Sequence, residues 1–166
     1  MAINLEQDAD IVWFRNPFHH FHPDADFQLS SDHYAGDPFS TDNHANTGML
    51  YIKSTPLTID FLNLWQRARQ FYPGLHSQEV FNKVKNCPVM RERGLRIKYI
   101  STEYFGGICE PSRNMSSVCT MHANCCVGLE NKSCYLKSVL EDWKNYLALP
   151  PAVRESNPPS WSLSGC

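Results

Sequence analysis

The sequence lacks a charge excess of either sign and lacks a long apolar run. Its 166 residues include 15 Lys and Arg against 17 Asp and Glu, for a formal net charge of -2. Such a balance offers no broad cationic face to neutralise a phosphate backbone. No stretch approaches the ~18–20 apolar residues of a membrane helix, and the opening "MAINLEQDAD" lacks the basic and apolar regions of a signal peptide. We therefore expect no nucleic acid as partner and no membrane segment in this chain.

Internal repeats and low-complexity segments are also missing, which favours one ordinary domain. Cysteine, by contrast, is abundant for a cytosolic domain of this size, with seven residues. Two acceptor sequons, at Asn114 and Asn131, also fit a lumenal protein. A missing N-terminal segment would reconcile these features with the absence of a signal.

Apolar periodicity predicts two helices and three strands. The helices are expected over 57–72, capped by Thr55 with Pro56 in the first turn, and over 134–148, behind a Ser133 cap. Both should present an apolar face to a core. Strands are expected at Ile11–Phe14, Met49–Ile52 and Leu95–Ile100, with room for one weak strand in "MAINLEQ". Strands interleaved with helices indicate an α/β layer structure.

The triplet Asp-Ala-Asp occurs twice, at 8–10 and 24–26. Asp8 and Asp10 can reach one Mn²⁺ or Mg²⁺ if the backbone turns there, because oxygen ligands suit such ions. An acidic turn or helix cap is the alternative. The second triplet follows "HHFHP", and these histidines could form a transition-metal site with Asp24 and Asp26. Their spacing fits no regular helical or strand face, so we interpret the segment as a solvated loop.

The segment "CTMHANCCVGL" at 119–129 contains zinc-type donor atoms in Cys119, His122, Cys125 and Cys126. Structural zinc sites normally use two separated pairs, and adjacent cysteines rarely bind one ion. Disulfides or buried thiols are the favoured interpretation. His122 then remains free for another role, and Lys132 is a candidate to meet a phosphate charge.

The order of the motifs indicates a family. "DADIVWFRNPF", "DFQLSSD", "NTGMLYI" with "FLNLW", "PGLHSQEVFN", "YFGGIC" and "CTMHANCCVGLENK" before "VLEDWKNYL" together resemble the plant nucleotide-diphospho-sugar transferase domain of glycosyltransferase family 77. The resemblance extends from about residue 8 to residue 166. It implies a GT-A-like, Rossmann-like mixed sheet with flanking helices. It also implies a metal-dependent glycosyltransferase that moves a sugar, with retention, from a nucleoside-diphosphate sugar such as a UDP-sugar to a cell-wall glycan or glycoprotein.

The resemblance also implies roles for individual residues. Asp10 and His122 would bind Mn²⁺ or Mg²⁺, while Gly128 and Lys132 would form the diphosphate-binding turn. The cation and the Lys132 ammonium would stabilise charge on the departing diphosphate.

The donor side of the implied site involves other positions. Asp8 would lie against the ribose and donor sugar, and Asn46 and Gly48 would line the sugar pocket. The family usually carries Asp-Gln where this chain has Ser77 and Gln78, so an acidic residue facing the donor or acceptor is replaced by a hydroxyl.

The resemblance further implies about a hundred residues before the Asp-x-Asp triplet, by analogy with the fold. Residues 1–149 are therefore expected to be the C-terminal portion of a transferase domain, and residues 150–166 a Pro-rich tail. Full-length family members are expected in the Golgi lumen or membrane. Two alternatives stay open: a truncated, inactive relative that acts as a binding or assembly partner, and a small zinc-binding module.

Overall fold

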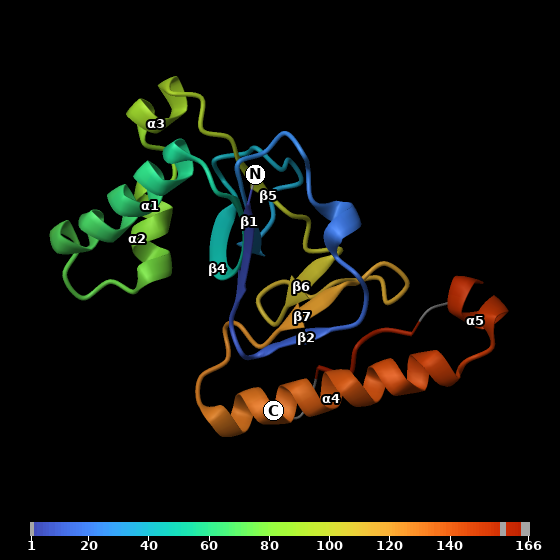
Figure 1. Ribbon diagram of the computed structural model, residues 1–166. Helices are drawn as coiled ribbons and strands as arrows, with labels where there is room; N and C mark the ends of the chain where they lie inside the picture. The colour runs from blue at the N-terminus through green and yellow to red at the C-terminus, as the bar shows by residue number, and fades with distance from the viewer. Residues whose placement is uncertain (1, 157–158, 164–166) are drawn as a thin grey trace. The chain divides into compact units, whose positions relative to one another are not determined.

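The computed structural model describes residues 2–156 and 159–163. The chain divides into two compact units (Figure 1). Unit 1 comprises Met1–Asp8 and Phe21–Ile100, and unit 2 comprises Ala9–His20 and Ser101–Cys166. Each unit has its own sheet and its own apolar cluster. The mixed α/β class expected from the sequence is confirmed.

Unit 1 is built on a four-stranded sheet with the order β1-β4-β3-β5. These strands span Ile3–Gln7 (β1), His44–Lys53 (β4), Phe27–His33 (β3) and Ile97–Tyr99 (β5). β4 pairs antiparallel with β1 and β3, whereas β5 runs parallel to β3. The predicted strands at 49–52 and 95–100 and the weak N-terminal strand are confirmed with shifted ends. β3 was missed because Gln28, Ser30 and Ser31 are buried in it, so its sequence shows no apolar run.

Helix α1, Pro56–Ala68, begins where the sequence predicts. Thr55 and Thr58 form a reciprocal capping box, which satisfies backbone N–H groups at the start of the helix. A 3-10 turn, η2 (Arg69–Phe71), extends it. The prediction that the core-facing apolar helix extends to residue 72 is wrong at its end, because the exposed fractions of Phe71 and Tyr72 are 78% and 36%.

Two further helices of unit 1, α2 (Ser77–Val84) and α3 (Pro88–Glu92), follow α1. α2 lies beside α1 in the ribbon diagram (Figure 1). Phe27 of β3, Phe61 of α1 and Phe81 of α2 are fully buried and pack ring against ring at centroid distances of 5.6–5.8 Å. This aromatic cluster joins the helices to the sheet.

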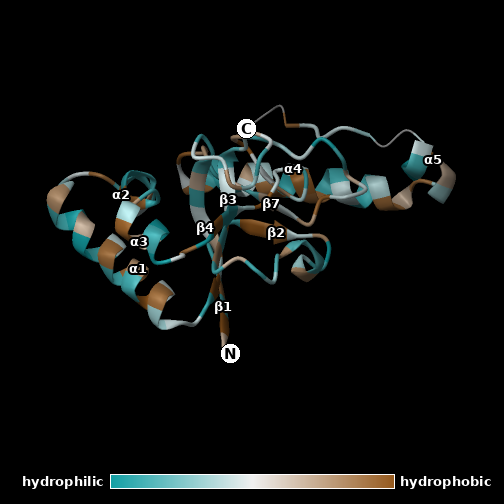
Figure 2. Ribbon diagram, turned by 90° about the horizontal axis from the view of Figure 1, so that it is seen from above, coloured by the Kyte–Doolittle hydropathy of each residue, from teal (hydrophilic) through white to brown (hydrophobic). Residues whose placement is uncertain are grey.

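Unit 2 contains a three-stranded sheet with the order β2-β7-β6. β2 is Ile11–Trp13, β7 is Thr120–His122 and β6 is Phe105–Gly107, and a 3-10 turn, η1 (Phe18–His20), follows β2. β7 pairs antiparallel with β2 and parallel with β6. The apolar β2 stands out in the hydropathy colouring (Figure 2) and confirms the strand predicted there.

Helix α4, Leu129–Ala148, is the longest helix of the chain that the structure describes. Its residues Tyr135 and Val139 are buried against Val118 and Met121. The predicted start at residue 134 behind a Ser133 cap is wrong: α4 begins at Leu129 after Gly128, and the polar residues 130–132 belong to the helix. The helical spacing of apolar residues could not indicate residues 130–132, because these polar residues do not face the core.

The predicted Pro-rich tail contains a short helix, α5 (Pro151–Ser156), and residues 157–158 and 164–166 of it lie outside the described residues. Among the described helices, none is both long and apolar enough to cross a membrane.

Candidate functional site

Two residues singled out from the sequence, Asp10 and His122, meet in unit 2. Asp10 lies directly before β2, and His122 is the last residue of β7. Ile11 pairs with His122, and the Ala123 N–H donates to the Asp10 carbonyl at 3.0 Å. This register places Asp10 Oδ1 3.2 Å from His122 Nε2. Residues 112 positions apart are thus joined by the pairing of two short strands.

Lys132 approaches the same carboxylate from α4. Gly128 has φ of +91°, a conformation that glycine adopts without a Cβ penalty, and its carbonyl accepts a hydrogen bond from the Lys132 N–H at 3.1 Å. The Lys132 ammonium then donates to Asp10 Oδ2. Asp10, His122 and Lys132 together form what we call the Asp10 cluster.

The Asp10 cluster is partly shielded from water. The exposed fractions of the Asp10, His122 and Lys132 side chains are 18%, 9% and 34%. Burial acts to raise the pKa of Asp10, but the hydrogen bond from Lys132 and the charges of His122 and Lys132 outweigh it and lower that pKa. Asp10 is therefore an ionised carboxylate at neutral pH.

The donor set of the Asp10 cluster fits a divalent cation. Two ligand atoms at ~2.1 Å from one ion, at right angles to each other, lie about 3 Å apart. The 3.2 Å between Asp10 Oδ1 and His122 Nε2 is close to that spacing. A carboxylate oxygen combined with an imidazole nitrogen suits Mn²⁺ better than Mg²⁺, which prefers oxygen ligands.

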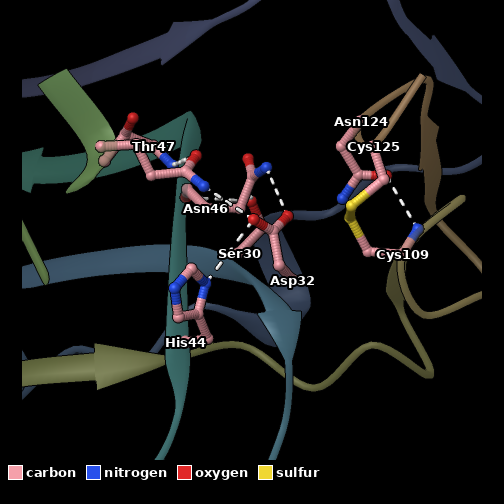
Figure 3. The surroundings of a disulfide bond; sticks show 9 residues. Ser30, Asp32, His44, Asn46, Thr47, Cys109, Asn124 and Cys125 are labelled. Atoms are coloured by element: carbon pink, nitrogen blue, oxygen red, sulfur yellow. Dashed lines mark hydrogen bonds and ion pairs between the residues drawn. A yellow bond between two sulfur atoms is a disulfide. The ribbon is translucent and has the colours of Figure 1, made fainter. Parts of the chain in front are cut away.

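The turn between β7 and α4 is clamped by a disulfide. Cys125 is bonded to Cys109, and the Cys109 N–H donates to Asn124 Oδ1 at 3.2 Å (Figure 3). Gly107 permits this packing, because a Cβ there would lie 2.3 Å from Asn124 Oδ1. The disulfide and the Asn124 contact begin two residues after His122, so they restrain the backbone that carries the His122 side chain.

The disulfide also decides between the interpretations of the cysteine-rich segment. Cys125 is bonded and Cys119 is a buried thiol that contacts the Asn16 carbonyl oxygen at 3.9 Å. The preference for disulfides or buried thiols over a zinc site is confirmed at these two positions. No sequence pattern identifies which cysteines pair.

A second polar cluster, in unit 1, contains Asn46 and Gln78. Asp32 Oδ1 accepts from Asn46 Nδ2 at 2.8 Å, and Asp32 Oδ2 accepts from Gln78 Nε2 at 2.6 Å. Gln78 Oε1 in turn accepts from the Thr47 N–H at 3.1 Å. Asn46 and His44 are directed towards Asp32 in Figure 3. We call Asp32, Asn46 and Gln78 the Asp32 cluster.

No role was predicted for Asp32, although it is the last residue of the motif "DFQLSSD". It lies near the end of β3, the strand that showed no apolar run. The motif itself was the one signal that could have identified it.

Three other predicted site residues also lie in unit 1. The Gly48 N–H donates to Asn46 Oδ1 at 2.9 Å, and the Gly48 carbonyl accepts from the Asp8 N–H at 2.7 Å. Ser77 is exposed at the first residue of α2, and its carbonyl accepts from Trp65 Nε1 at 2.9 Å. The backbone of Gly48 thus links the Asp8 backbone to the Asn46 side chain.

The second Asp-Ala-Asp triplet lies in a loop, as expected. Asp24 pairs with Arg96 at 2.7 Å, and Asp26 accepts from the Arg96 N–H at 3.0 Å. Its carboxylates tie the loop to the residues before β5.

Comparison with known proteins identifies the family. The model of the nucleotide-diphospho-sugar transferase family matches residues 5–136, and this chain belongs to that family. It is 44% identical to the uncharacterized protein At4g15970 of Arabidopsis thaliana over 135 residues, which cover 81% of this chain and 37% of the relative. It is 32% identical to the uncharacterized protein At1g28695 of the same plant over 142 residues, 85% of this chain and 42% of that protein. The chain therefore spans about two fifths of these relatives' length. No solved structure matches it significantly.

Proposed function

We propose that this chain forms part of a glycosyltransferase that moves a sugar from a UDP-linked donor to a cell-wall glycan or glycoprotein, with retention of configuration. Membership of the nucleotide-diphospho-sugar transferase family supports this proposal. The observation that carries it is the Asp10 cluster, in which a carboxylate, an imidazole and an ammonium converge. Such a combination suits a metal-bound diphosphate.

In this proposal Asp10 and His122 hold Mn²⁺ or Mg²⁺. A bound cation would neutralise negative charge on the leaving diphosphate. Lys132 pairs with Asp10 in the protein described here, and a diphosphate would offer its ammonium a second anionic partner. The backbone N–H groups in the first turn of α4, which follow Gly128, favour an anion at the same place.

The Asp32 cluster is proposed to contact the donor sugar. Asn46 and Gln78 are held by Asp32, so their amide groups are fixed before any ligand arrives. Asp8 and Gly48 are proposed to line the donor site beside Asn46. Asp32 also provides a carboxylate next to Gln78, where Ser77 leaves the family's usual acidic position without charge.

The proposed location is the Golgi lumen, where the full-length family is expected. The Cys109–Cys125 disulfide supports an oxidising compartment, because cytosolic thiols are kept reduced.

An alternative is a non-catalytic relative that binds or assembles with active transferases. The observation in its favour is Ser77, an exposed hydroxyl in place of a carboxylate. Binding of a full-length homologue without turnover of any donor would support this alternative.

The proposal is tested by following release of UDP from a panel of UDP-sugars with Mn²⁺ and a glycan acceptor. Asp10→Asn is expected to abolish turnover and Mn²⁺ binding while the protein stays folded by circular dichroism. Asp24→Asn is a matched control, since it makes the same change in the second Asp-Ala-Asp triplet, and it should leave turnover intact. Turnover that survives Asp10→Asn would refute the metal assignment.

A further inference from the structure

Unit 1 contains a small cavity that none of the roles above uses. It is about 190 Å³ in volume and lies between the loop at 39–41, the turn after α2, the end of α3 and β5 with the residues before it. Cavities that hold drug-sized ligands usually measure ~300–1,000 Å³. This one therefore suits a single small group rather than a whole nucleotide sugar. We call it the Tyr99 pocket.

Positive charge dominates the wall of the Tyr99 pocket. Lys85, Arg91 and Arg96 line it, and no Asp or Glu is among the lining residues within the described part of the chain. Arg96 also pairs with Asp24 at 2.7 Å, and Asp42 acts on Lys85 from outside the wall. Even with these two carboxylates counted, the pocket and its surroundings stay cationic.

The hydroxyl of Tyr99 is the second unusual feature. Tyr99 lines the pocket with a residue exposure of 4%, and its buried oxygen has no hydrogen-bond partner within residues 2–156 and 159–163. Buried tyrosine hydroxyls normally find a partner. Tyr99 and Lys85 both line the pocket, and the Lys85 ammonium, which donates to the Asn43 carbonyl, lies 5.5 Å from the centre of the Tyr99 ring.

The loop that closes the pocket is held in place. Asn43 is fully buried, its Oδ1 accepts from the Ala35 N–H at 2.8 Å, and its Nδ2 donates to the Asp37 carbonyl at 2.7 Å and the Ser40 carbonyl at 3.0 Å. The Tyr99 N–H donates to the Pro38 carbonyl at 2.8 Å. The hydroxyls of Ser40 and Thr41 are thereby carried on a fixed loop beside the cations.

We propose that the Tyr99 pocket binds an oxyanion of the phosphate class, through Arg91, Lys85 and the Tyr99 hydroxyl. A tetrahedral anion accepts several hydrogen bonds at once, which the guanidinium, ammonium and hydroxyl donors supply. Burial lowers the pKa of Lys85 against the opposing effect of Asp42, and a bound anion would favour its charged form. The site is separate in its residues from the Asp10 and Asp32 clusters, so it is independent of the proposed transferase activity.

Titration calorimetry with inorganic phosphate at constant ionic strength tests this site. EDTA removes phosphate binding through a metal ion. The measurements are made in a Lys132→Gln variant, which removes phosphate binding at the proposed diphosphate site. We expect saturable binding that Arg91→Gln weakens roughly tenfold or more, as loss of a charged hydrogen bond implies. Arg67→Gln, which removes one exposed charge elsewhere on unit 1, should leave the affinity unchanged.

Tyr99→Phe separates binding from folding. Because the hydroxyl has no hydrogen-bond partner among the residues that the structure describes, its removal should weaken phosphate binding without lowering the melting temperature. The proposal would be overturned if the protein showed no saturable phosphate binding. It would also be overturned if both Arg91→Gln and Tyr99→Phe left that binding unchanged.

Two further probes identify the source of the anion. Glucose 1-phosphate that binds more tightly than inorganic phosphate would indicate a sugar phosphate or another phosphate ester, and equal affinities would indicate free phosphate. Acetate that binds more tightly than either would exclude the phosphate class and so contradict the proposal.

Discussion

At the residue scale, Asp32 is the polar group on which most of the unit 1 cluster depends. Its two carboxylate oxygens accept from Asn46 and Gln78, which come from β4 and α2. A side chain with only one accepting oxygen cannot serve both donors. The stability of unit 1 therefore depends on a residue that we also place at the donor sugar.

Asp32→Asn is expected to lower the free energy of unfolding by about 1–3 kcal/mol, because one buried donor loses its partner. Urea denaturation followed by circular dichroism measures the change. Asp42→Asn, which makes the same substitution at an exposed position, should change it by less than ~0.5 kcal/mol. Equal effects of the two substitutions would show that the Asp32 hydrogen bonds contribute nothing net.

Tyr135 gives a prediction at alkaline pH. Burial, with a smaller effect of Cys126, raises the pKa of Tyr135 above its ordinary value of 10.0. A group whose pKa is higher in the folded than in the unfolded state stabilises the folded state. This contribution is complete below the pKa of the unfolded state and is lost as the pH rises above it. The loss begins near pH 10, where the unfolded chain starts to release the phenolic proton.

Tyr135→Phe should therefore flatten the decline in stability above pH ~10, since phenylalanine has no proton to lose. The free energy of unfolding of both proteins, measured by urea titration from pH 8 to 11, tests this. Tyr72→Phe at an exposed position is the control and should keep the wild-type slope. An unchanged slope in Tyr135→Phe would contradict the assignment.

At the element scale, the Cys109–Cys125 disulfide joins the loop after β6 to the turn after β7. It closes a loop across a sequence separation of 16 residues, and closure of such a loop stabilises by about 3 kcal/mol in the chain-entropy account. The paired variant Cys109→Ser/Cys125→Ser should lose stability of this order. Because the clamp restrains the turn after His122, the variant should also bind Mn²⁺ more weakly.

Denaturation and Mn²⁺ titration by electron paramagnetic resonance measure both effects. Cys126→Ser is a close control, because Cys126 adjoins the disulfide but carries a free thiol. A paired variant with wild-type Mn²⁺ affinity would show that the disulfide does not position His122.

Some helices and strands could be predicted from the sequence and others could not. α1 was predictable because Thr55, Pro56 and a regular apolar period mark its start. β3 and the first turn of α4 were not, because their polar residues are buried or face the Asp10 cluster instead of following an apolar pattern. Of the candidate site residues, Asp10 and His122 meet as the resemblance implied, whereas Asp32 depends on the register of β3 with β4, which no local pattern encodes.

At the scale of the whole molecule, two separate apolar clusters hold the chain, one in each unit. The proposed metal ligands Asp10 and His122 both belong to unit 2. A ligand that binds only the folded state stabilises it by RT ln(1 + [L]/Kd), which is about 2.7 kcal/mol at a hundredfold excess of ligand over Kd. Metal binding should therefore slow the hydrogen exchange of backbone amides in unit 2.

Hydrogen exchange over the whole chain, with and without Mn²⁺, locates this effect. Slower exchange is expected at Ala123, whose N–H bonds the Asp10 carbonyl, and at Ile108, whose N–H bonds the His122 carbonyl. Asp10→Asn should abolish the slowing, while Asp24→Asn should preserve it, because Asp24 pairs with Arg96 in unit 1. If Mn²⁺ instead slows the amides around residues 24–26 and leaves β2 and β7 unchanged, the metal binds at the second Asp-Ala-Asp triplet and the assignment to Asp10 and His122 is wrong.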